Sequence, residues 1–347
     1  MKTSSIVISI GFLVSNLCYR SVGAHDVSDG LHHGEVDHHF HFDVAESIEN
    51  AHFDHDHDHS YRGLRMKEVS APMDVGNHTY ASKHEFIHGG HRCGSKKSSR
   101  KKVKESNEKL SKWMTDNKHR MDQASNVEVK TYFHVITSGS SGAISDATLT
   151  SQLSVLNNVY KSYGFSFKLI KTTRTNNASW FSAGLGSSTA SSMFKNLRVG
   201  GASTLNVYFN RAGGYLGYAS LPIDYDDFPG EDGVVVASGS VPGGSIRYYN
   251  EGKTLVHEVG HWLGLLHTFQ TDHISGNACF GNGDFVSDTP RQRYPTAGCP
   301  SRQDTCPRSS GLDMVSNFMD YSDDVCLTTF TTGQNDRMRA MWDTYRA

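Results

Sequence analysis

The feature that most constrains this chain is a run of eleven residues from His257 to His267, which has the form H-E-x-x-H-x-x-G-x-x-H. His257 and His261 are four positions apart, so on a helix they lie on one face, where two imidazoles can hold one metal ion. Gly264 has no Cβ, so the chain can leave the helix there with a positive φ and bring in His267 as a third ligand. Three protein ligands with an open fourth position are typical of a catalytic zinc, whereas structural zinc sites are closed.

Glu258 directly follows the first histidine, so its carboxylate is expected beside the metal. A carboxylate there can reach a water on the metal and accept its proton, which makes Glu258 the candidate general base. The alternative is a surface helix with incidental histidines, because the chain contains 20 of them. The additional glycine and third histidine argue against that alternative, since a bare H-E-x-x-H needs neither.

These eleven residues resemble the zinc motif of the metzincin metalloproteases. Metzincins also carry a methionine turn downstream of the helix, and Met319 lies in a segment that resembles it. Thr268 follows the third histidine, and Asp288-Thr289-Pro290 and the segment 319–326 complete the pattern. Together these features are similar to the pappalysin family, in particular to its secreted fungal-type and cytophagalysin-like members. The resemblance extends over about 126–347.

The resemblance implies an α+β metzincin fold. A twisted mixed sheet, with a backing helix and the active-site helix, is expected above a cleft. An irregular, disulfide-stapled lower part with a C-terminal helix is expected below it. In this fold Met319 forms an apolar floor beneath the metal, and Gly264 ends the active-site helix. Tyr321 is implied as a donor to the reaction's oxyanion, the alternative being a tyrosine that only packs in the turn.

Hydrophobic periodicity predicts the elements of this fold independently. Leu149, Leu153, Leu156 and Tyr160 fall on one face of a helix, which Asp146 could cap and Gly164 could end. A second helix is expected at the C-terminus, with Met338, Met341 and Trp342 on its buried face. Alternating or β-rich runs predict five strands, at 127–136, 165–170, 204–209, 217–221 and 233–236.

The fourth predicted strand is the candidate substrate-binding edge, with Gly217, Tyr218 and Ala219 as its residues. Pro222 follows closely, and proline is tolerated in a sheet only at an edge. In the fold implied by the resemblance, an extended substrate adds to this edge through main-chain hydrogen bonds.

The N-terminus predicts a secreted protein. Lys2, an apolar run at 6–14 and Val22-Gly23-Ala24 have the form of a signal peptide of residues 1–24, and the run is too short to cross a bilayer. The net charge is −2, so no bulk electrostatic partner is indicated, neither nucleic acid nor membrane. We expect an extracellular monomer.

Six cysteines fit this compartment. Cys18 leaves with the signal peptide. Four others cluster late in the chain, and an even set in an exported protein predicts disulfides whose pairing the sequence leaves open among three choices. The family resemblance implies Cys279 with Cys306 and Cys299 with Cys326. A structural zinc on these four is the alternative, but the C-x2-C spacing of such sites is missing.

The stretch before the catalytic domain has an unusual composition. We expect a pro-segment and basic linker at 25–110 and the catalytic domain at 111–347. Residues 25–91 hold 14 of the 20 histidines and few large apolar residues, so they are not expected to fold alone. A solvated, disordered spacer is the favoured interpretation, and a zinc-binding pro-segment is the alternative.

Cys93 is the remaining cysteine, within Arg92-Cys93-Gly94. It resembles the cysteine switch of metzincin zymogens, in which a pro-segment thiolate occupies the open zinc position. An incidental thiol is the alternative. Residues 96–104 contain six Lys and Arg, which predicts an exposed, flexible activation segment with Arg100-Lys101-Lys102 as a candidate cut site. A nucleic-acid patch is less compatible with export.

Asp284 and Asp288 lie in an acidic turn at 283–290. The resemblance implies calcium in this neighbourhood, with the two carboxylates as oxygen ligands. The alternative is an ordinary Asp- and Gly-rich turn.

The sequence therefore predicts a zinc-dependent endopeptidase, made as a zymogen, that acts on proteins or peptides. The alternative from another class is a secreted, histidine-rich zinc-binding protein without catalysis. The latter would need neither Glu258 nor Met319, and both are present.

Overall fold

The computed structural model describes residues 70–76, 78–94, 98–117, 126–271 and 278–347. All of them belong to one unit of the chain, 58–347. The predicted signal peptide and the histidine-rich residues up to 69 lie outside the described residues. Among those described, no helix is both long and apolar enough to cross a membrane.

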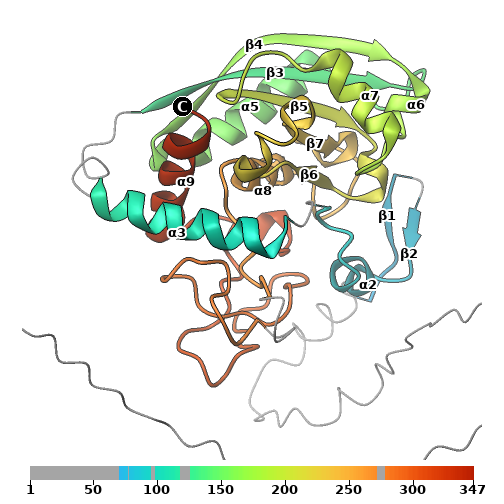
Figure 1. Cartoon of the computed structure of the whole chain (residues 1–347). Helices are drawn as coiled ribbons and strands as arrows, with labels where there is room; N and C mark the ends of the chain where they lie inside the picture. Colours follow the sequence, from blue (N-terminus) through green and yellow to red (C-terminus); the bar gives the residue numbers. More distant parts are fainter. Residues whose placement is uncertain (1–69, 77, 95–97, 118–125, 272–277) are drawn as a thin grey trace, which may run out of the picture. The chain divides into compact units, whose positions relative to one another are not determined.

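A five-stranded sheet forms the upper part of this unit (Figure 1). The strand order is β4-β3-β5-β7-β6, with parallel pairing from β4 to β7 and antiparallel pairing of β6 with β7. β6 is thus an edge strand, as the sequence predicts. The strands are β3 (Val127–Thr137), β4 (Phe165–Asn176), β5 (Thr204–Asn210), β6 (Gly217–Ala219) and β7 (Val234–Ala237).

The five predicted strands are present, and only β4 and β6 differ from the predicted bounds by more than one residue. β4 continues to Asn176 because it pairs along the whole of β3. β6 ends at Ala219, before the predicted residue 221, because Pro222 opens the short 3-10 turn η4 (Pro222–Asp224).

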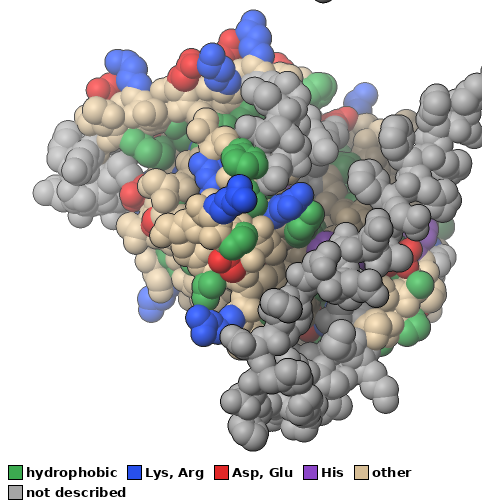
Figure 2. All heavy atoms as spheres, turned by 90° about the horizontal axis from the view of Figure 1, so that it is seen from below, with side chains coloured by type: hydrophobic (Ala, Val, Ile, Leu, Met, Phe, Trp, Pro, Cys, Tyr) green, Lys and Arg blue, Asp and Glu red, His purple; other side chains and the backbone are tan. Residues whose placement is uncertain are grey.

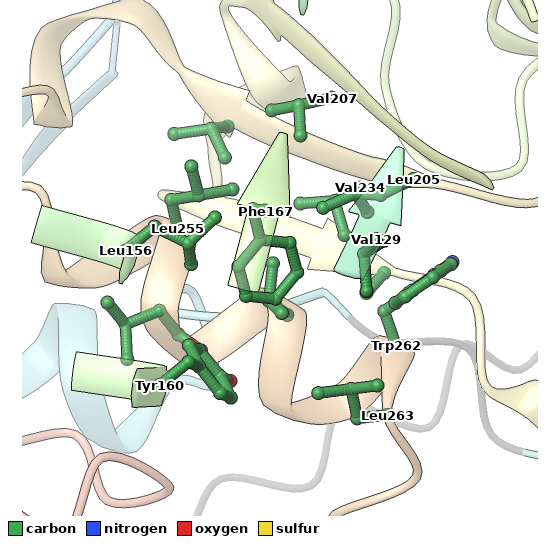
Figure 3. Close-up of a cluster of buried hydrophobic side chains, with 14 of the residues drawn as sticks. Val129, Leu156, Tyr160, Phe167, Leu205, Val207, Val234, Leu255, Trp262 and Leu263 are labelled. Carbon is green, nitrogen blue, oxygen red and sulfur yellow. The ribbon is translucent and has the colours of Figure 1, made fainter. Parts of the chain in front are cut away.

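Helices cover both faces of the sheet. α5 (Asp146–Tyr160) and α8 (Lys253–Trp262) pack on one face, and α6 (Ala178–Phe181) and α7 (Ser188–Leu197) on the other. Successive side chains of β5 point to opposite faces of the sheet. Leu205 and Val207, labelled in Figure 3, and Phe209 pack on the face that α5 and α8 cover. Tyr208 packs on Phe194 of α7, on the other face.

The predicted helix after β3 is present, but the expected cap is wrong. Ser145, not Asp146, caps α5, because the Ser145 side chain accepts a hydrogen bond from the Thr148 amide. Asp146 instead lies in the first turn and pairs with Arg174 of β4. Gly164 closes the following 3-10 turn, η2 (Lys161–Tyr163), in the left-handed conformation, with φ +70°.

The lower part of the unit has little regular secondary structure in its described residues, 265–271 and 278–330. Two disulfides cross it, Cys279–Cys306 and Cys299–Cys326, which is the pairing that the family resemblance implies. Seen from below in Figure 2, exposed hydrophobic side chains are scattered among polar ones.

α9 (Thr332–Tyr345) closes the chain as predicted. Thr331 and Gln334 form a capping box at its start, and Met338, Met341 and Trp342 are buried on its inner face.

The N-terminal region is more ordered than the sequence predicts. A hairpin of β1 (Met73–Val75) and β2 (His78–Tyr80) precedes α2 (Lys83–His88). The prediction of a disordered spacer is wrong for the described part of 70–91. Its few apolar side chains are buried against the catalytic part of the chain, which a composition average over 25–91 conceals. They are Met73, Val75, Phe86 and Ile87.

α3 (Arg100–Asp116) also differs from expectation. It begins inside the basic stretch predicted to be flexible, with Ser99 as its N-cap, and it crosses the predicted boundary between 110 and 111. Val103 and Leu110 place α3 on α9 and η4, against Met341 and Leu221. The domain boundary itself stays a prediction.

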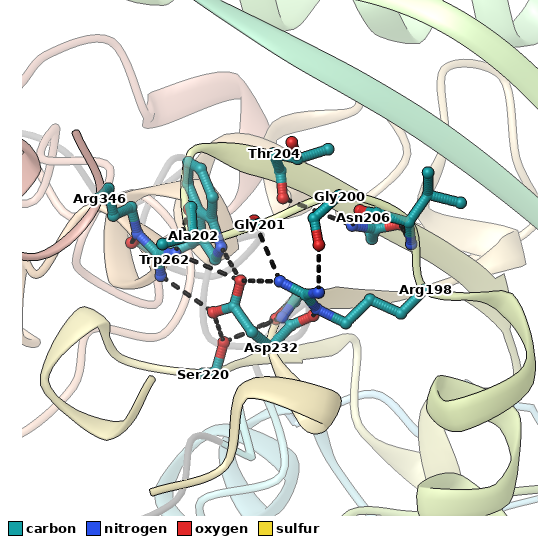
Figure 4. A network of polar contacts seen from close by, with 12 residues as sticks. Arg198, Gly200, Gly201, Ala202, Thr204, Asn206, Ser220, Asp232, Trp262 and Arg346 are labelled. Atoms are coloured by element: carbon teal, nitrogen blue, oxygen red, sulfur yellow. Dashed lines mark hydrogen bonds and ion pairs between the residues drawn. The ribbon is translucent and has the colours of Figure 1, made fainter. Parts of the chain in front are cut away.

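A buried ionic network at Asp232 joins the end of β6, the end of α8 and the C-terminus (Figure 4). The Asp232 carboxylate lies 3.1 Å from the Arg346 guanidinium, and both side chains are at most 1% exposed. Trp262 Nε1 and Ser220 Oγ donate to the same carboxylate, at 3.2 and 2.7 Å. Arg346 also donates to the Trp262 carbonyl, at 2.7 Å. The network therefore locks α8 to the edge strand.

Replacing Asp232 by alanine should lower the free energy of unfolding by about 3–5 kcal/mol, because Arg346 would stay buried without its counter-ion. Denaturant unfolding followed by tryptophan fluorescence measures the change. Glu128→Ala is the control, since its ion pair with Lys168 is exposed on both sides and should contribute less than about 1 kcal/mol. Equal losses in the two variants would contradict this role for Asp232.

Candidate metal centre and active site

The histidine motif lies on α8, a helix with no exposed face. Every residue from Thr254 to Trp262 is buried. Apart from the two histidines and Glu258, the residues of this stretch are therefore apolar or small. Its N-terminus is held by Asp324, whose Oδ2 accepts from the amides of Glu251 and Lys253 at 2.9 and 3.4 Å. The segment that follows the methionine turn thus fixes the start of the metal-binding helix.

The three predicted histidine ligands converge. His267 Nε2 lies 3.0 Å from His261 Nε2 and 3.3 Å from His257 Nε2. With the thiol of Cys93, they form a group whose ligand atoms all lie within 4.8 Å of one another. Imidazole nitrogen and thiolate sulfur are the ligands that zinc takes, whereas calcium takes oxygen. The donor set therefore fits a transition metal such as zinc.

Hydrogen bonds on the far side of two rings fix the form that a metal requires. His257 Nδ1 lies 2.7 Å from the Phe318 carbonyl oxygen, and His261 Nδ1 lies 2.8 Å from that of Leu265. A carbonyl only accepts, so Nδ1 carries the proton and Nε2 presents its lone pair. Burial lowers the pKa of all three histidines, that of His261 to about 4. The rings are therefore neutral.

Two glycines of the motif are required by close contacts. Gly264 has φ +95°, and a Cβ there would lie 2.4 Å from Met341 Cγ, so the turn that delivers His267 needs glycine. A Cβ on Gly260 would lie 2.5 Å from Met319 Sδ. Met319 thus packs directly against α8 between the two histidine ligands, as an apolar contact. The importance of Gly260 was not evident from the sequence, since the motif leaves that position open.

Glu258 is the buried carboxyl group beside the ligands. Burial raises its pKa to about 8, although the nearby Arg92 guanidinium and the Cys93 thiol both act to lower it. The Cys93 thiol donates to Glu258 Oε2 at 3.4 Å, and Oε1 has no hydrogen-bond partner among the described residues. Oε1 of the carboxyl group can therefore accept a further hydrogen bond, while Oε2 is covered by the segment that carries Cys93.

Tyr321 lies over the same centre. Its ring centroid is 4.9 Å from that of His267, and its hydroxyl donates to the Cys93 carbonyl oxygen at 3.4 Å. Burial raises its pKa well above the usual value for tyrosine, so the hydroxyl keeps its proton and can donate. Its observed acceptor is a peptide carbonyl held over the metal ligands.

The residues around Cys93 add to the edge strand. Gly94 donates from its amide to the Gly217 carbonyl at 3.0 Å, and the Leu216 amide donates to the Arg92 carbonyl at 3.2 Å. The pairing is parallel to β6. A Cβ on Gly217 would lie 2.7 Å from Glu258 Cγ, so the predicted edge residue touches the candidate base. The edge that could bind a substrate is thus occupied by the chain itself.

Two basic residues of the segment before α3 are buried here, and the sequence did not predict the burial of either. Arg92 is 0% exposed and lies over the rings of Tyr249 and Tyr321, and within the described part of the chain its guanidinium has no hydrogen-bond partner. Lys83 forms an ion pair with Asp323 at 2.9 Å, and both side chains are under 9% exposed. No local pattern marks either residue, because their burial depends on contacts distant in sequence.

The candidate calcium ligands occupy separate roles. Asp288 caps the start of α9 by accepting from Thr331 Oγ1 and the Gly333 amide, at 2.7 and 2.9 Å. Asp284 accepts from Thr289 through Oδ1, at 2.7 Å, while its Oδ2 is buried without a partner from the described residues. Burial raises the pKa of Asp284 to about 6. Among the residues that the structure describes, these two carboxylates are not part of a group of three candidate metal ligands.

The chain is similar to known metalloproteases over about two thirds of its length. A family model described as pregnancy-associated plasma protein-A, peptidase family M43, matches residues 231–343. Extracellular metalloprotease 1 of Coccidioides posadasii is 48% identical over 230 residues, which cover 64% of this chain and 79% of that protein. The extracellular metalloprotease of Uncinocarpus reesii is 47% identical over 238 residues, 65% of this chain and 80% of that protein.

Solved structures give the same relationship. Mirolysin in complex with a compound is similar with a TM-score of 0.57 and 31% identity, over 64% of this chain and 93% of that one. A glutamate-to-alanine mutant of Tannerella forsythia promirolysin is similar with a TM-score of 0.57 and 28% identity, over 74% of this chain and 94% of that one. From its sequence relatives, its fold and its histidine centre, the chain belongs to the pappalysin family of metalloproteases.

Proposed function

We propose that the protein is a secreted endopeptidase that binds one zinc ion on His257, His261 and His267 and hydrolyses internal peptide bonds of proteins. The observation that carries the proposal is the convergence of three neutral Nε2 atoms beside a buried carboxyl group, at the end of an edge strand that the segment around Cys93 pairs with in this chain. Its relatives are named extracellular metalloproteases, in agreement with action outside the cell. We expect a monomer without nucleic-acid or membrane partners.

Each residue of the site has a separate role in the proposed hydrolysis. Bound zinc supplies a Lewis acid, which polarises the scissile carbonyl and lowers the pKa of water. Glu258 accepts the proton of the attacking water and passes it to the leaving amine. The Tyr321 hydroxyl, which now donates to a peptide carbonyl of the pro-segment, donates to the oxygen that becomes negative. β6 aligns the substrate through main-chain hydrogen bonds from Gly217 to Ala219.

The histidine-rich zinc-binding protein is the weaker candidate. A metal store needs only ligands, yet this chain surrounds its ligands with a catalytic carboxyl group, a tyrosine hydroxyl and an edge strand. The histidines up to residue 69 lie outside the described residues, so metal binding by them stays an alternative. The metal content of the processed protein separates the two candidates: one ion per chain indicates the peptidase, several indicate a store.

Glu258→Ala should keep about one zinc per chain and lower casein hydrolysis at least about 100-fold, because it removes the proton acceptor and leaves the ligands intact. Metal analysis and a casein assay on the processed protein measure both effects. Glu251→Ala is the matched control, since that carboxylate is 48% exposed and pairs with Lys253, away from the metal ligands. Casein hydrolysis by Glu258→Ala at the control rate would refute the proposed base.

The uncleaved chain is proposed to be latent, with Cys93 as the pro-segment ligand of the metal. Its thiol lies within the histidine group, and the flanking residues pair with β6. The buried ion pair of Lys83 with Asp323 anchors the same segment from α2. Latency thus has three supports: the thiol, the strand pairing and the ion pair.

Cys93→Ser should give the uncleaved chain measurable peptidase activity, because serine is a much poorer zinc ligand than a thiolate. The activity should rise further when Lys83→Met is added, since that change removes a second anchor without touching the metal ligands. Hydrolysis of a fluorogenic peptide by chains shown to be intact on a gel measures both. A Cys93→Ser chain as inert as its parent would show that the thiol does not maintain latency.

Calcium is proposed at Asp284, where a buried carboxylate oxygen has no partner among the residues described. Adding calcium in excess to the zinc-loaded protein should then raise the melting temperature, by roughly 2–4 °C for each kcal/mol of binding energy. Asp284→Asn should show no such shift. The proposal fails if calcium leaves the melting temperature of the parent unchanged, or shifts parent and variant alike.

A further inference from the structure

A recess of about 270 Å³ lies beside the edge strand, outside the metal centre. Its walls come from the end of β6, from α7, from the loop after η4 and from the start of α3. The volume is below the roughly 300–1,000 Å³ of sites for small molecules, so it suits a single side chain. The residues used below are Tyr218, Asp224, Asp227, Phe194, Phe228 and Lys102.

One residue that lines the recess has a buried hydroxyl group with no partner in the described part of the protein. Tyr218 belongs to β6 and is only 3% exposed, and no described residue forms a hydrogen bond with its hydroxyl. Burial, and to a lesser extent the nearby Glu231 carboxylate, raise the pKa of Tyr218 above the usual value for tyrosine. A buried hydroxyl normally finds a partner. A polar group of a ligand in the recess would supply the partner that this hydroxyl lacks among the described residues.

The rim of the recess is acidic, and an ammonium group from the chain already occupies it. Lys102 Nζ lies 3.0 Å from an Asp224 oxygen and 2.6 Å from an Asp227 oxygen. Burial lowers the pKa of Lys102, but its hydrogen bonds to Asp227 and Asp224 outweigh that effect and raise it. Its neighbours in the basic stretch, Lys101 and Lys104, are 86% and 79% exposed, whereas Lys102 is 28% exposed. Of these three lysines, only Lys102 is partly buried, and it pairs with the two aspartates of the recess.

The walls match the remainder of such a side chain. Phe194 and Phe228 line the recess, and lysine and arginine bury their aliphatic stems on apolar surface while the charged group stays near water. The recess thus combines two carboxylates, apolar walls and a tyrosine hydroxyl without a partner among the described residues. These groups are complementary to a long basic side chain. They are not complementary to an acidic one.

The recess lies at a defined distance from the bond that is cut. Gly217 touches Glu258, while Tyr218, Ala219 and Ser220 line the recess further along β6. Successive residues of a strand advance about 3.3 Å. A peptide paired with β6 therefore brings the side chain two or three residues from its reacting bond to the recess.

We propose that this recess binds a lysine or arginine side chain of the substrate, two or three residues from the cleaved bond, and that Lys102 stands in for it in the uncleaved chain. The inference rests on the peptidase function proposed above and adds the substrate class to it. Asp224 and Asp227 are the residues that determine this preference.

The test uses Lys102→Ser as the reference enzyme, because that change removes the ammonium group that pairs with Asp224 and Asp227, wherever the activating cleavage falls. Fluorogenic peptides carry one lysine, or its uncharged analogue norleucine, at each position from three before to three after the cut. At one position two or three residues from the cut, lysine should be preferred over norleucine about three- to tenfold in kcat/KM. This corresponds to a partly exposed ion pair.

Adding Asp224→Asn and Asp227→Asn to the reference should reduce that ratio to about one, because kcat/KM for the lysine peptide falls more than kcat/KM for the norleucine peptide. Asp226→Asn is the matched control, since it removes the same charge from the same loop at a position outside the recess lining and should keep the preference. The proposal is overturned by a ratio near one in the reference enzyme. It is also overturned if the ratio survives in the Asp224/Asp227 variant, or is lost equally in the Asp226 variant.

Failure of the peptidase function would look different. In that case the reference enzyme cleaves neither peptide, or cleaves both when Glu258 is replaced by alanine. A charge preference that is absent while Glu258-dependent cleavage persists refutes only the subsite.

Discussion

The centre of this molecule depends on two backbone carbonyls that orient two imidazole rings. His257 is held by Phe318 and His261 by Leu265, and these bonds present the Nε2 lone pairs to one point. Phe318 belongs to the methionine turn, whose next residue packs against Gly260 of α8. The irregular lower part of the chain therefore places one carbonyl and one thioether against the metal-binding helix. The disulfides that cross this part restrain the segment that supplies them.

The segment around Cys93 contacts the same side chains and edge strand that the proposed mechanism uses. Glu258 and Tyr321 both contact Cys93, through its thiol and its carbonyl, and Gly217 accepts from Gly94 as it would from a substrate amide. The segment around Cys93 pairs with β6 in the parallel sense, and its thiol lies within the histidine group. Burial of Arg92 and Lys83 strengthens this docking. It also explains why a stretch too polar to fold alone is ordered on this surface.

The sequence was sufficient where function is carried by spacing on a regular element. Helix geometry alone brings His257 and His261 together, and a glycine after them predicts the turn to His267. It was insufficient where burial depends on distant contacts. The polar first turn of α3 predicts flexibility, yet Val103 and Leu110 pack the helix on α9 and η4. The buried guanidinium of Arg92 and the Asp232 network follow from tertiary packing, and no local pattern marks them.

The two ends of β6 link latency with substrate preference. At one end, Leu216 and Gly217 pair with the segment that carries Cys93; at the other, Ser220 shares Asp232 with the network that locks α8 and the C-terminus. The recess opens between the second end and α3. The uncleaved chain thus covers the edge strand twice, with a thiol at the reacting centre and an ammonium at the recess. The two contacts come from residues on either side of 95–97. Under the proposed function, the surface that Cys93 and Lys102 cover in the uncleaved chain is the one that the substrate would bind.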